Sequence, residues 1–165
     1  VSLPESILLR CLDRQWQVHY KIEPSCASKL ISRDTSLFVS AKDNHHAKQT
    51  LRRWLKRTAK KHLLPALAQI SKELDLEYCS VSIRSQKTRW GSCSQKRKIN
   101  LNQNALFLPQ EWVRYLCIHE LCHTVHLNHS KRFWRLLEKF EPAYRELDKN
   151  LNKGNHYVPL WAIER

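Results

Sequence analysis

The residues from 119 to 129 have the types and the spacing of a catalytic metal site. They begin with His-Glu-Leu-Cys-His, an HExxH pattern, and a further histidine follows ten positions after the first. His119 and His123 lie one turn apart on one face of a helix, so both imidazoles can reach one cation. Glu120 lies beside them, where it can contact a metal-bound water without binding the metal. Because zinc in a catalytic site takes three protein ligands and keeps one open position, the segment predicts a zinc-dependent hydrolase.

The third ligand has to approach the metal from another direction, since one helix face offers only two histidines to one cation. Asn128 can end the first helix because asparagine tolerates a left-handed conformation, and Ser130 is a good N-cap for the next helix. This break falls where His129 turns back toward the first two histidines, and we predict His129 as the third ligand. Glu138 and Glu141, on the following helix, are the alternative ligands.

His126 occupies the position that is glycine in the similar motif HExxHxxGxxH. As a ligand it would lie three residues past His123, at the helix end, and we expect it instead to support a ligand from behind or to face solvent. Without a metal, the segment would be an ordinary amphipathic helix with exposed histidines. That interpretation does not explain why Glu120 and three histidines fall in register.

Three further motifs accompany the HELCH helix, at residues 89–94 (RWGSCS), 99–102 (INLN) and 128–134 (NHSKRFW). In combination they resemble the YgjP-like metallopeptidase family, and they are similar to the WLM and SprT-like proteases, which share a compact zincin core. The resemblance covers about residues 80 to 145 well and the N-terminal third more weakly. It implies a zincin-like α+β fold, Zn²⁺ bound by His119, His123 and His129, and Glu120 as the catalytic base.

Length and composition predict one domain over residues 1–165, because a chain with 42% hydrophobic residues and six tryptophans can bury a real core. We divide it into a β-rich part (1–42), a basic helical segment (43–76) and a metal-binding core (77–165). No apolar run approaches the length of a membrane span, and no signal peptide is visible. The six cysteines form no CxxC pair, which favours free thiols and a cytoplasmic location.

The expected elements follow from hydrophobic periodicity and from turn residues. We expect strands, antiparallel in the N-terminal part, at 7–9, 16–22, 37–39, 80–84 and 99–102. We expect helices at 47–76, from Pro109 through the HExxH residues, after 131, and from 142 to 151. Pro65 is expected to kink or break the first helix, and Gly154 to stop the last.

Four residues upstream of the metal helix are predicted to contact the substrate: Trp90, Gly91, Asn100 and Asn102. Gly91 is one of only two glycines in the chain, and a scarce glycine between strands marks a bulge or a close backbone approach. The resemblance implies that the strand at 99–102 is an edge strand along the cleft. An extended peptide can join such a strand through main-chain hydrogen bonds.

The net charge of +14 indicates an anionic partner or substrate. No acid occurs from residue 44 to 72 or from 78 to 110, and the helical segment places basic residues along one side. This side is either a solvated helix face or a footprint for the phosphates of a nucleic acid or nucleotide. The residues predicted to form the footprint are Lys48, Arg52, Arg53, Lys56, Arg57 and Lys60.

The predicted chemistry is hydrolysis of a peptide or protein substrate. Three neutral imidazoles leave zinc its full charge, which lowers the pKa of bound water, and Glu120 moves the proton from water to the leaving amine. Three residues are candidates for stabilising the oxyanion, and the sequence does not rank them: Tyr144, Tyr157 and His156. The alternative functions are a nucleoside triphosphate pyrophosphohydrolase, although no glycine-rich phosphate loop or acidic magnesium cluster is present, and a protease associated with nucleic acid. Oligomeric state is not predicted.

Overall fold

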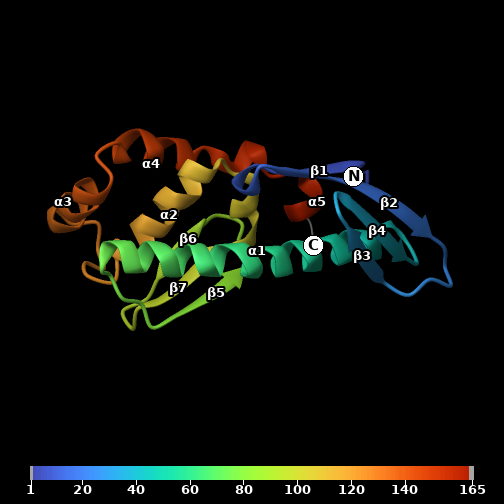
Figure 1. Cartoon of the computed structure of the whole chain (residues 1–165), viewed down its shortest axis with the longest axis horizontal. Helices are drawn as coiled ribbons and strands as arrows, with labels where there is room; N and C mark the ends of the chain where they lie inside the picture. The colour runs from blue at the N-terminus through green and yellow to red at the C-terminus, as the bar shows by residue number, and fades with distance from the viewer. Residues whose placement is uncertain (1, 164–165) are drawn as a thin grey trace.

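The computed structural model describes residues 2–163, and its long axis follows helix α1 (Asn44–Leu74). A four-stranded N-terminal sheet lies at the beginning of this helix (Figure 1). A three-stranded sheet and most of the remaining helices lie along its later part (Figure 1). The expected α+β class is therefore confirmed. None of the described helices combines the length and the apolarity needed to cross a membrane.

The N-terminal sheet has the order β1-β2-β4-β3. Its strands are β1 (Ser6–Leu9), β2 (Arg14–Ile22), β3 (Lys29–Arg33) and β4 (Ser36–Ala41). β1–β2 and β3–β4 are antiparallel, but β2 and β4 are parallel, with Val18 opposite Leu37. The expectation of a purely antiparallel sheet was wrong. β3 and β4 form a hairpin with a tight turn at Asp34, which has a φ of 51°, and β4 lies between β3 and β2. The alternation of apolar and polar residues shows which face of a strand is buried. It does not show which strand lies beside it or in which direction that strand runs.

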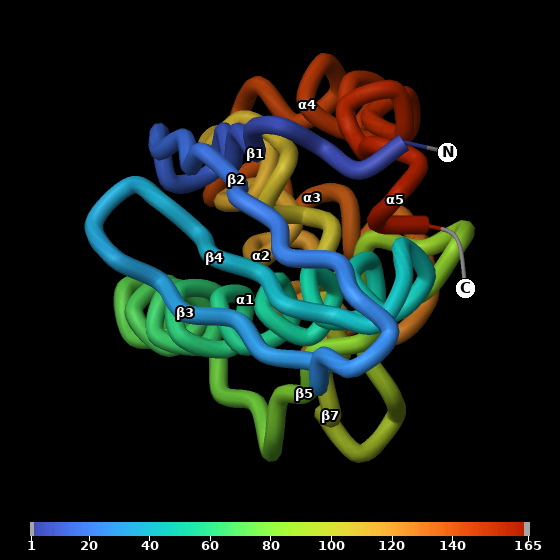
Figure 2. Tube along the Cα trace, turned by 90° about the vertical axis from the view of Figure 1, so that its right-hand side faces the viewer, coloured from blue at the N-terminus to red at the C-terminus, as the bar shows by residue number. Residues whose placement is uncertain are grey.

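The inner face of this sheet packs on the first half of α1. Trp16 of β2 meets Trp54 of α1 edge-on, with ring centroids 5.2 Å apart. Leu37 and Val39 of β4 are buried in the same core. Viewed along the long axis, the N-terminal sheet crosses in front of α1, and β5 (Ser80–Arg84) and β7 (Lys98–Asn102) lie below the helix (Figure 2).

Helix α1 continues without a break through Pro65, contrary to the expected kink or break. Proline removes only one hydrogen bond, to the carbonyl of Lys61, and both residues lie on the exposed side of the helix. Leu63 and Leu67, on the opposite side, are fully buried and hold the helix on the core. Asp43 is the N-cap of the helix, and its side chain accepts a hydrogen bond from the backbone N–H of His46.

The three-stranded sheet consists of β5 (Ser80–Arg84), β7 (Lys98–Asn102) and β6 (Gly91–Cys93), in that order. The strands predicted at 80–84 and 99–102 are confirmed. The prediction that 99–102 is the edge strand was wrong, because β7 lies in the centre and is parallel to β5 and antiparallel to β6. The strand that borders the active-site helix is β6, which is too short to show alternation in the sequence.

The remaining helices and 3₁₀ segments cover the three-stranded sheet. The helices are α2 (Gln110–Cys122), α3 (Lys131–Phe140), α4 (Tyr144–Asn152) and α5 (Leu160–Ile163). The 3₁₀ segments are η1 (Arg10–Leu12), η2 (Gln103–Phe107) and η3 (Gly154–Tyr157). Buried apolar residues from both sheets and from α1 to α5 form one hydrophobic cluster.

Candidate metal centre

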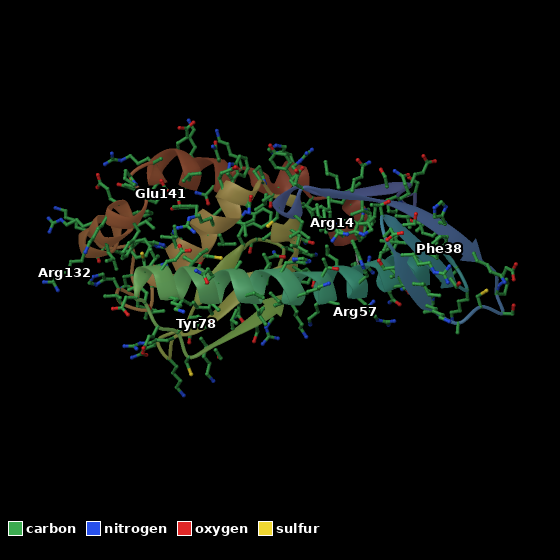
Figure 3. The ribbon with its side chains drawn as sticks, viewed as in Figure 1. Arg14, Phe38, Arg57, Tyr78, Arg132 and Glu141 are labelled. Carbon is green, nitrogen blue, oxygen red and sulfur yellow. The ribbon has the colours of Figure 1, made fainter. Side chains whose placement is uncertain are left out.

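The three predicted histidines converge at the end of the molecule where α2 leads into α3. The Nε2 atom of His119 lies 3.2 Å from those of His123 and His129, and the last two are 3.1 Å apart. Three nitrogens bound tetrahedrally to one zinc at its usual bond length are about 3.3 Å apart. The triangle therefore has the size that one metal ion needs. In Figure 3 the label of Arg132, on α3, marks this end of the molecule, opposite Phe38 of the N-terminal sheet.

The local sequence explains how one segment supplies all three ligands. α2 ends at Cys122, and His123 is its C-cap residue in helical conformation, so His119 and His123 stay on one face. α3 begins after Ser130, whose side chain accepts a hydrogen bond from the backbone N–H of Phe133. The predicted break and N-cap are confirmed. The turn between the two helices directs His129 back toward the first two rings.

Hydrogen bonds at Nδ1 orient the two helical histidines. The Nδ1 atom of His123 lies 3.0 Å from the carbonyl oxygen of His126, a contact that requires a proton on Nδ1 and leaves the lone pair on Nε2. The Nδ1 atom of His119 lies 3.3 Å from the hydroxyl of Tyr115, which in turn donates to Asp148 at 2.7 Å. Since the Tyr115 proton is directed to Asp148, His119 donates from Nδ1 and also leaves Nε2 open. Both lone pairs point to the same place.

The ligand rings are held in an aromatic and apolar surrounding. Phe133 stacks on His123 with centroids 4.3 Å apart, and Trp134 stacks on His129 at 5.5 Å. Burial, and then the neighbouring histidines, lower the pKa of His119 to about 3, and burial also lowers the pKa of His123. Both imidazoles are therefore neutral near pH 7 and have no proton to lose before they bind a metal.

Glu120 lies beside the histidines with its side chain packed against the edge strand. The residue is only 5% exposed, and burial raises the pKa of its carboxyl to about 8, against the opposing effect of the Arg89 guanidinium. A Cβ atom at position 91 would lie 3.1 Å from the Oε2 atom of Glu120. The predicted close approach at Gly91 is confirmed, and the group that approaches is the carboxyl of the HExxH motif.

A cavity of about 390 Å³ joins these groups. Its lining includes the three histidines, Glu120 and all of β6, so the metal cluster and the edge strand share one open space. Of the predicted substrate residues, Trp90 and Gly91 line the cavity.

Asn100 and Asn102 lie outside this cavity and support it from behind. The amide of Asn102 is 4% exposed and donates to the carbonyl oxygens of Gln86 and Arg89. Asn100 donates to the hydroxyl of Ser92. Both side chains therefore fix the segment that leads into β6.

None of the three oxyanion candidates lines the cavity. Tyr144 is buried against Trp134, Tyr157 meets Trp112 edge-on, and His156 contacts the carbonyl oxygen of Lys153 through Nδ1. Five polar side chains that were not among the predicted site residues do line it: Thr88, Arg89, Ser92, Asp148 and Asn152. Arg89 and Ser92 belong to the motif at 89–94, whereas Asp148 and Asn152 lie on α4 with no sequence signal to connect them to the site.

The alternative ligands stay apart from the histidine cluster. Glu141 accepts a hydrogen bond from the backbone N–H of Ala143, and Glu138 is exposed on α3. The carbonyl oxygen of His126 accepts the hydrogen bond from Nδ1 of His123, so His126 supports the His123 ring on the side away from the cluster.

The predicted basic footprint lies on α1 and does not line the metal cavity. Four of its residues, Arg53, Lys56, Arg57 and Lys60, are exposed. Lys48 and Arg52 are half-buried, and Arg52 donates to the carbonyl oxygen of Trp161 at 2.8 Å. Arg52 therefore has a structural role between α1 and α5.

Two histidines on a helix, a third from the following turn and a carboxyl against the neighbouring edge strand form a candidate site for metal-dependent hydrolysis. The model of the YgjP-like metallopeptidase domain matches residues 2–154. The chain therefore belongs to the YgjP-like metallopeptidase family and is a peptidase-like hydrolase, as the sequence motifs predicted.

A solved structure supports the same class. The chain is similar to the crystal structure of the metallopeptidase zymogen abylysin of Pyrococcus abyssi, with 28% sequence identity and a TM-score of 0.51. The match covers 57% of this chain and 95% of that chain. A search among curated proteins found no significant match.

The Tyr115 hydroxyl can be tested as the group that orients His119. Tyr115→Phe keeps the buried ring and removes the acceptor for the Nδ1 proton, so we expect metal affinity to fall about tenfold to a hundredfold. Competition with a chromophoric chelator measures this affinity. Tyr20→Phe, which removes a buried hydroxyl bonded to the carbonyl oxygen of Pro4 in the N-terminal sheet, is the control. Equal affinity of the two variants would contradict the orienting role.

Proposed function

We propose that this protein is a zinc metallopeptidase in which Glu120 activates the attacking water. The observation that carries the proposal is the triangle of three imidazole nitrogens, about 3.2 Å on a side, in one cavity with the Glu120 carboxyl. Three neutral imidazoles suit zinc and leave one of its four positions open. When bound, the ion supplies a Lewis acid and lowers the pKa of its water toward neutrality.

Glu120 is the proton carrier in this proposal. Its carboxylate accepts a proton from water as the oxygen adds to the peptide carbonyl carbon, and it returns the proton to the nitrogen of the leaving amine as the C–N bond breaks. Its burial gives the carboxyl a pKa close to the pH at which the enzyme would work, and a divalent cation nearby favours the charged form. Both effects suit a group that has to gain and lose a proton in one reaction cycle.

The edge strand β6 provides the binding surface for an extended peptide. The carbonyl oxygen of Trp90 accepts from Asn102, and the backbone N–H of Ser94 donates to Lys98, both across to β7. Because main-chain groups alternate in direction along a strand, those of Gly91 and Cys93 face away from β7, toward the cavity. A substrate strand can pair with them, which selects for an extended backbone more than for particular side chains.

The cavity favours a peptide over a nucleoside triphosphate. Among its described lining residues Arg89 is the only Lys or Arg, and Glu120 and Asp148 are acidic. A triphosphate would need more cationic groups or an acidic cluster for magnesium. Purified protein loaded with zinc should therefore hydrolyse an unfolded protein and leave a panel of nucleotides intact.

We also propose that the protein works in a reducing compartment such as the cytoplasm. All six cysteines are free. Burial raises the pKa of the Cys11 and Cys93 thiols to about 11, and that of Cys117 and Cys122 to about 12, so these four are poor nucleophiles.

Glu120→Gln tests the proton carrier. The amide keeps the shape of the side chain but cannot accept a proton, so we expect hydrolysis of an unfolded protein to fall at least about a hundredfold with zinc content unchanged. Metal analysis and a peptidase assay on the same sample give both quantities. Glu138→Gln, an exposed change on α3, is the control and should match the wild type. Normal turnover by Glu120→Gln would remove this residue from the mechanism.

His129→Ala tests the third ligand. We expect zinc to be lost on dialysis against a weak chelator, because two imidazoles hold the ion far less tightly than three. His126→Ala, three residues earlier and outside the cluster, should retain zinc. The reverse pattern would assign the third position to His126, and retention by both variants would point to Glu138.

Gly91→Ala tests the packing of the catalytic carboxyl. The added methyl group would lie 3.1 Å from Oε2 of Glu120 and 3.0 Å from the carbonyl oxygen of Asn100, so the flexible carboxyl has to move. We expect about a hundredfold loss of hydrolysis, because small displacements of a reacting group cost this much. Zinc affinity should stay within about twofold, since the histidines are not displaced. Unchanged hydrolysis would show that the position of this carboxyl is not critical.

A further inference from the structure

The whole excess of positive charge comes from two segments of the chain. Residues 44–72 and 78–110 contain fourteen of the 29 Lys and Arg residues and none of the 15 Asp and Glu residues. The other fifteen basic residues are matched by the fifteen acids, so the remainder of the chain has no net charge. A uniformly basic surface would suit general solubility, whereas this segregation indicates a localised function.

The fold brings these two segments together along the seam between α1 and β5. One cavity of about 290 Å³ lies over the seam and is lined by Lys56, Lys60 and Arg84. A second cavity, of about 360 Å³, is lined by Arg53 and again by Lys56. The two cavities share Lys56, and we call the pair together the basic groove. All four of these cations are exposed.

The chemistry of the basic groove suits a chain of phosphates. Lys56 and Lys60 are four residues apart, about 6 Å along the helix axis, and Arg84 lines the same cavity from the strand. Like charges at this spacing repel each other unless an anion lies between them. No described residue that lines either cavity is acidic. A row of anions would therefore relieve the repulsion along the full length of the groove.

We propose that the basic groove binds the phosphate backbone of a duplex nucleic acid without regard to sequence. The described lining residues include no aromatic side chain on which the bases of a single strand could stack. Contacts to the backbone position a protein on nucleic acid and do not read its sequence. A duplex, with two phosphates for every base pair, offers the denser array of charges.

The groove and the metal cavity can be occupied at the same time. β5 forms one edge of the three-stranded sheet and β6 the other, with β7 between them. The groove lies along β5 and the metal cavity along β6. Binding in the groove therefore depends on neither the metal nor Glu120, and it can be measured whether or not the proposed peptidase activity is found.

The test is binding of the full chain to a short labelled duplex DNA by fluorescence anisotropy. We expect two duplexes of unrelated sequence to bind equally, and affinity to fall about a hundredfold between about 50 and 200 mM salt, as four phosphate contacts predict. A variant with Lys56→Gln, Lys60→Gln and Arg84→Gln should bind at least about tenfold more weakly at low salt, with the salt slope reduced by about three.

The matched control is a variant with Lys21→Gln, Lys29→Gln and Arg33→Gln. It removes the same number of lysines and arginines, and all three lie exposed on the outer face of the N-terminal sheet. Its affinity should match that of the wild type, and its salt slope should differ by no more than about one, the value of a single phosphate contact. Thermal unfolding of both variants shows whether each is folded.

Three outcomes would overturn the proposal. The first is no binding of duplex at low salt. The second is an equal loss of affinity in the two triple variants, which would mean that net charge and not the groove attracts DNA. The third is binding through Lys56, Lys60 and Arg84 to a single-stranded oligonucleotide or to phosphatidylserine vesicles in preference to the duplex.

Discussion

The contact between Gly91 and Glu120 joins the two halves of the candidate site. One half is the helix α2 with its histidines, and the other is the edge strand β6 with its open main-chain groups. A side chain at position 91 would press on both the Glu120 carboxyl and the carbonyl oxygen of Asn100. Without a side chain there, the helix can approach the sheet closely enough for carboxyl, metal ligands and substrate strand to share one cavity. The contact therefore sets how closely the Glu120 carboxyl lies to the edge strand.

Around that contact the site is built so that few of its groups can move. Phe133 and Trp134 begin α3 and stack on two of the ligand rings, so the turn that brings His129 into place also supplies the packing that holds it. The third ring, that of His119, is tied through Tyr115 to α4. The metal triangle therefore depends on three helices, although its ligands come from one short segment. This arrangement lets the ligand segment stay short while its geometry is set by the core.

The sequence predicted the part of the site that is local and missed the part that depends on topology. HExxH spacing, the Ser130 N-cap and the scarce Gly91 are properties of neighbouring residues, and the structure shows the geometry each implied. β6 was missed because a strand of three residues is too short to show an alternation of apolar and polar residues. The edge position was assigned to β7 because such alternation does not reveal which strands lie beside it. The same limit explains the parallel β2–β4 pair. Asp148 was missed because its contact with Tyr115 spans 33 positions and no motif links them.

Segregation of charge resolves a conflict between a cationic protein and a candidate site for a divalent cation. A net charge of +14 spread evenly would oppose metal binding, but among the described residues that line the metal cavity Arg89 is the only Lys or Arg, against the acids Glu120 and Asp148. The basic groove lies beyond the opposite edge of the sheet, and β5 and β6 are separated by two strand spacings, about 10 Å. That distance is about one Debye length at 0.1 M salt, so solvent screening weakens the repulsion at the metal. The central strand β7 therefore acts as a spacer between the proposed anion-binding surface and the candidate metal site.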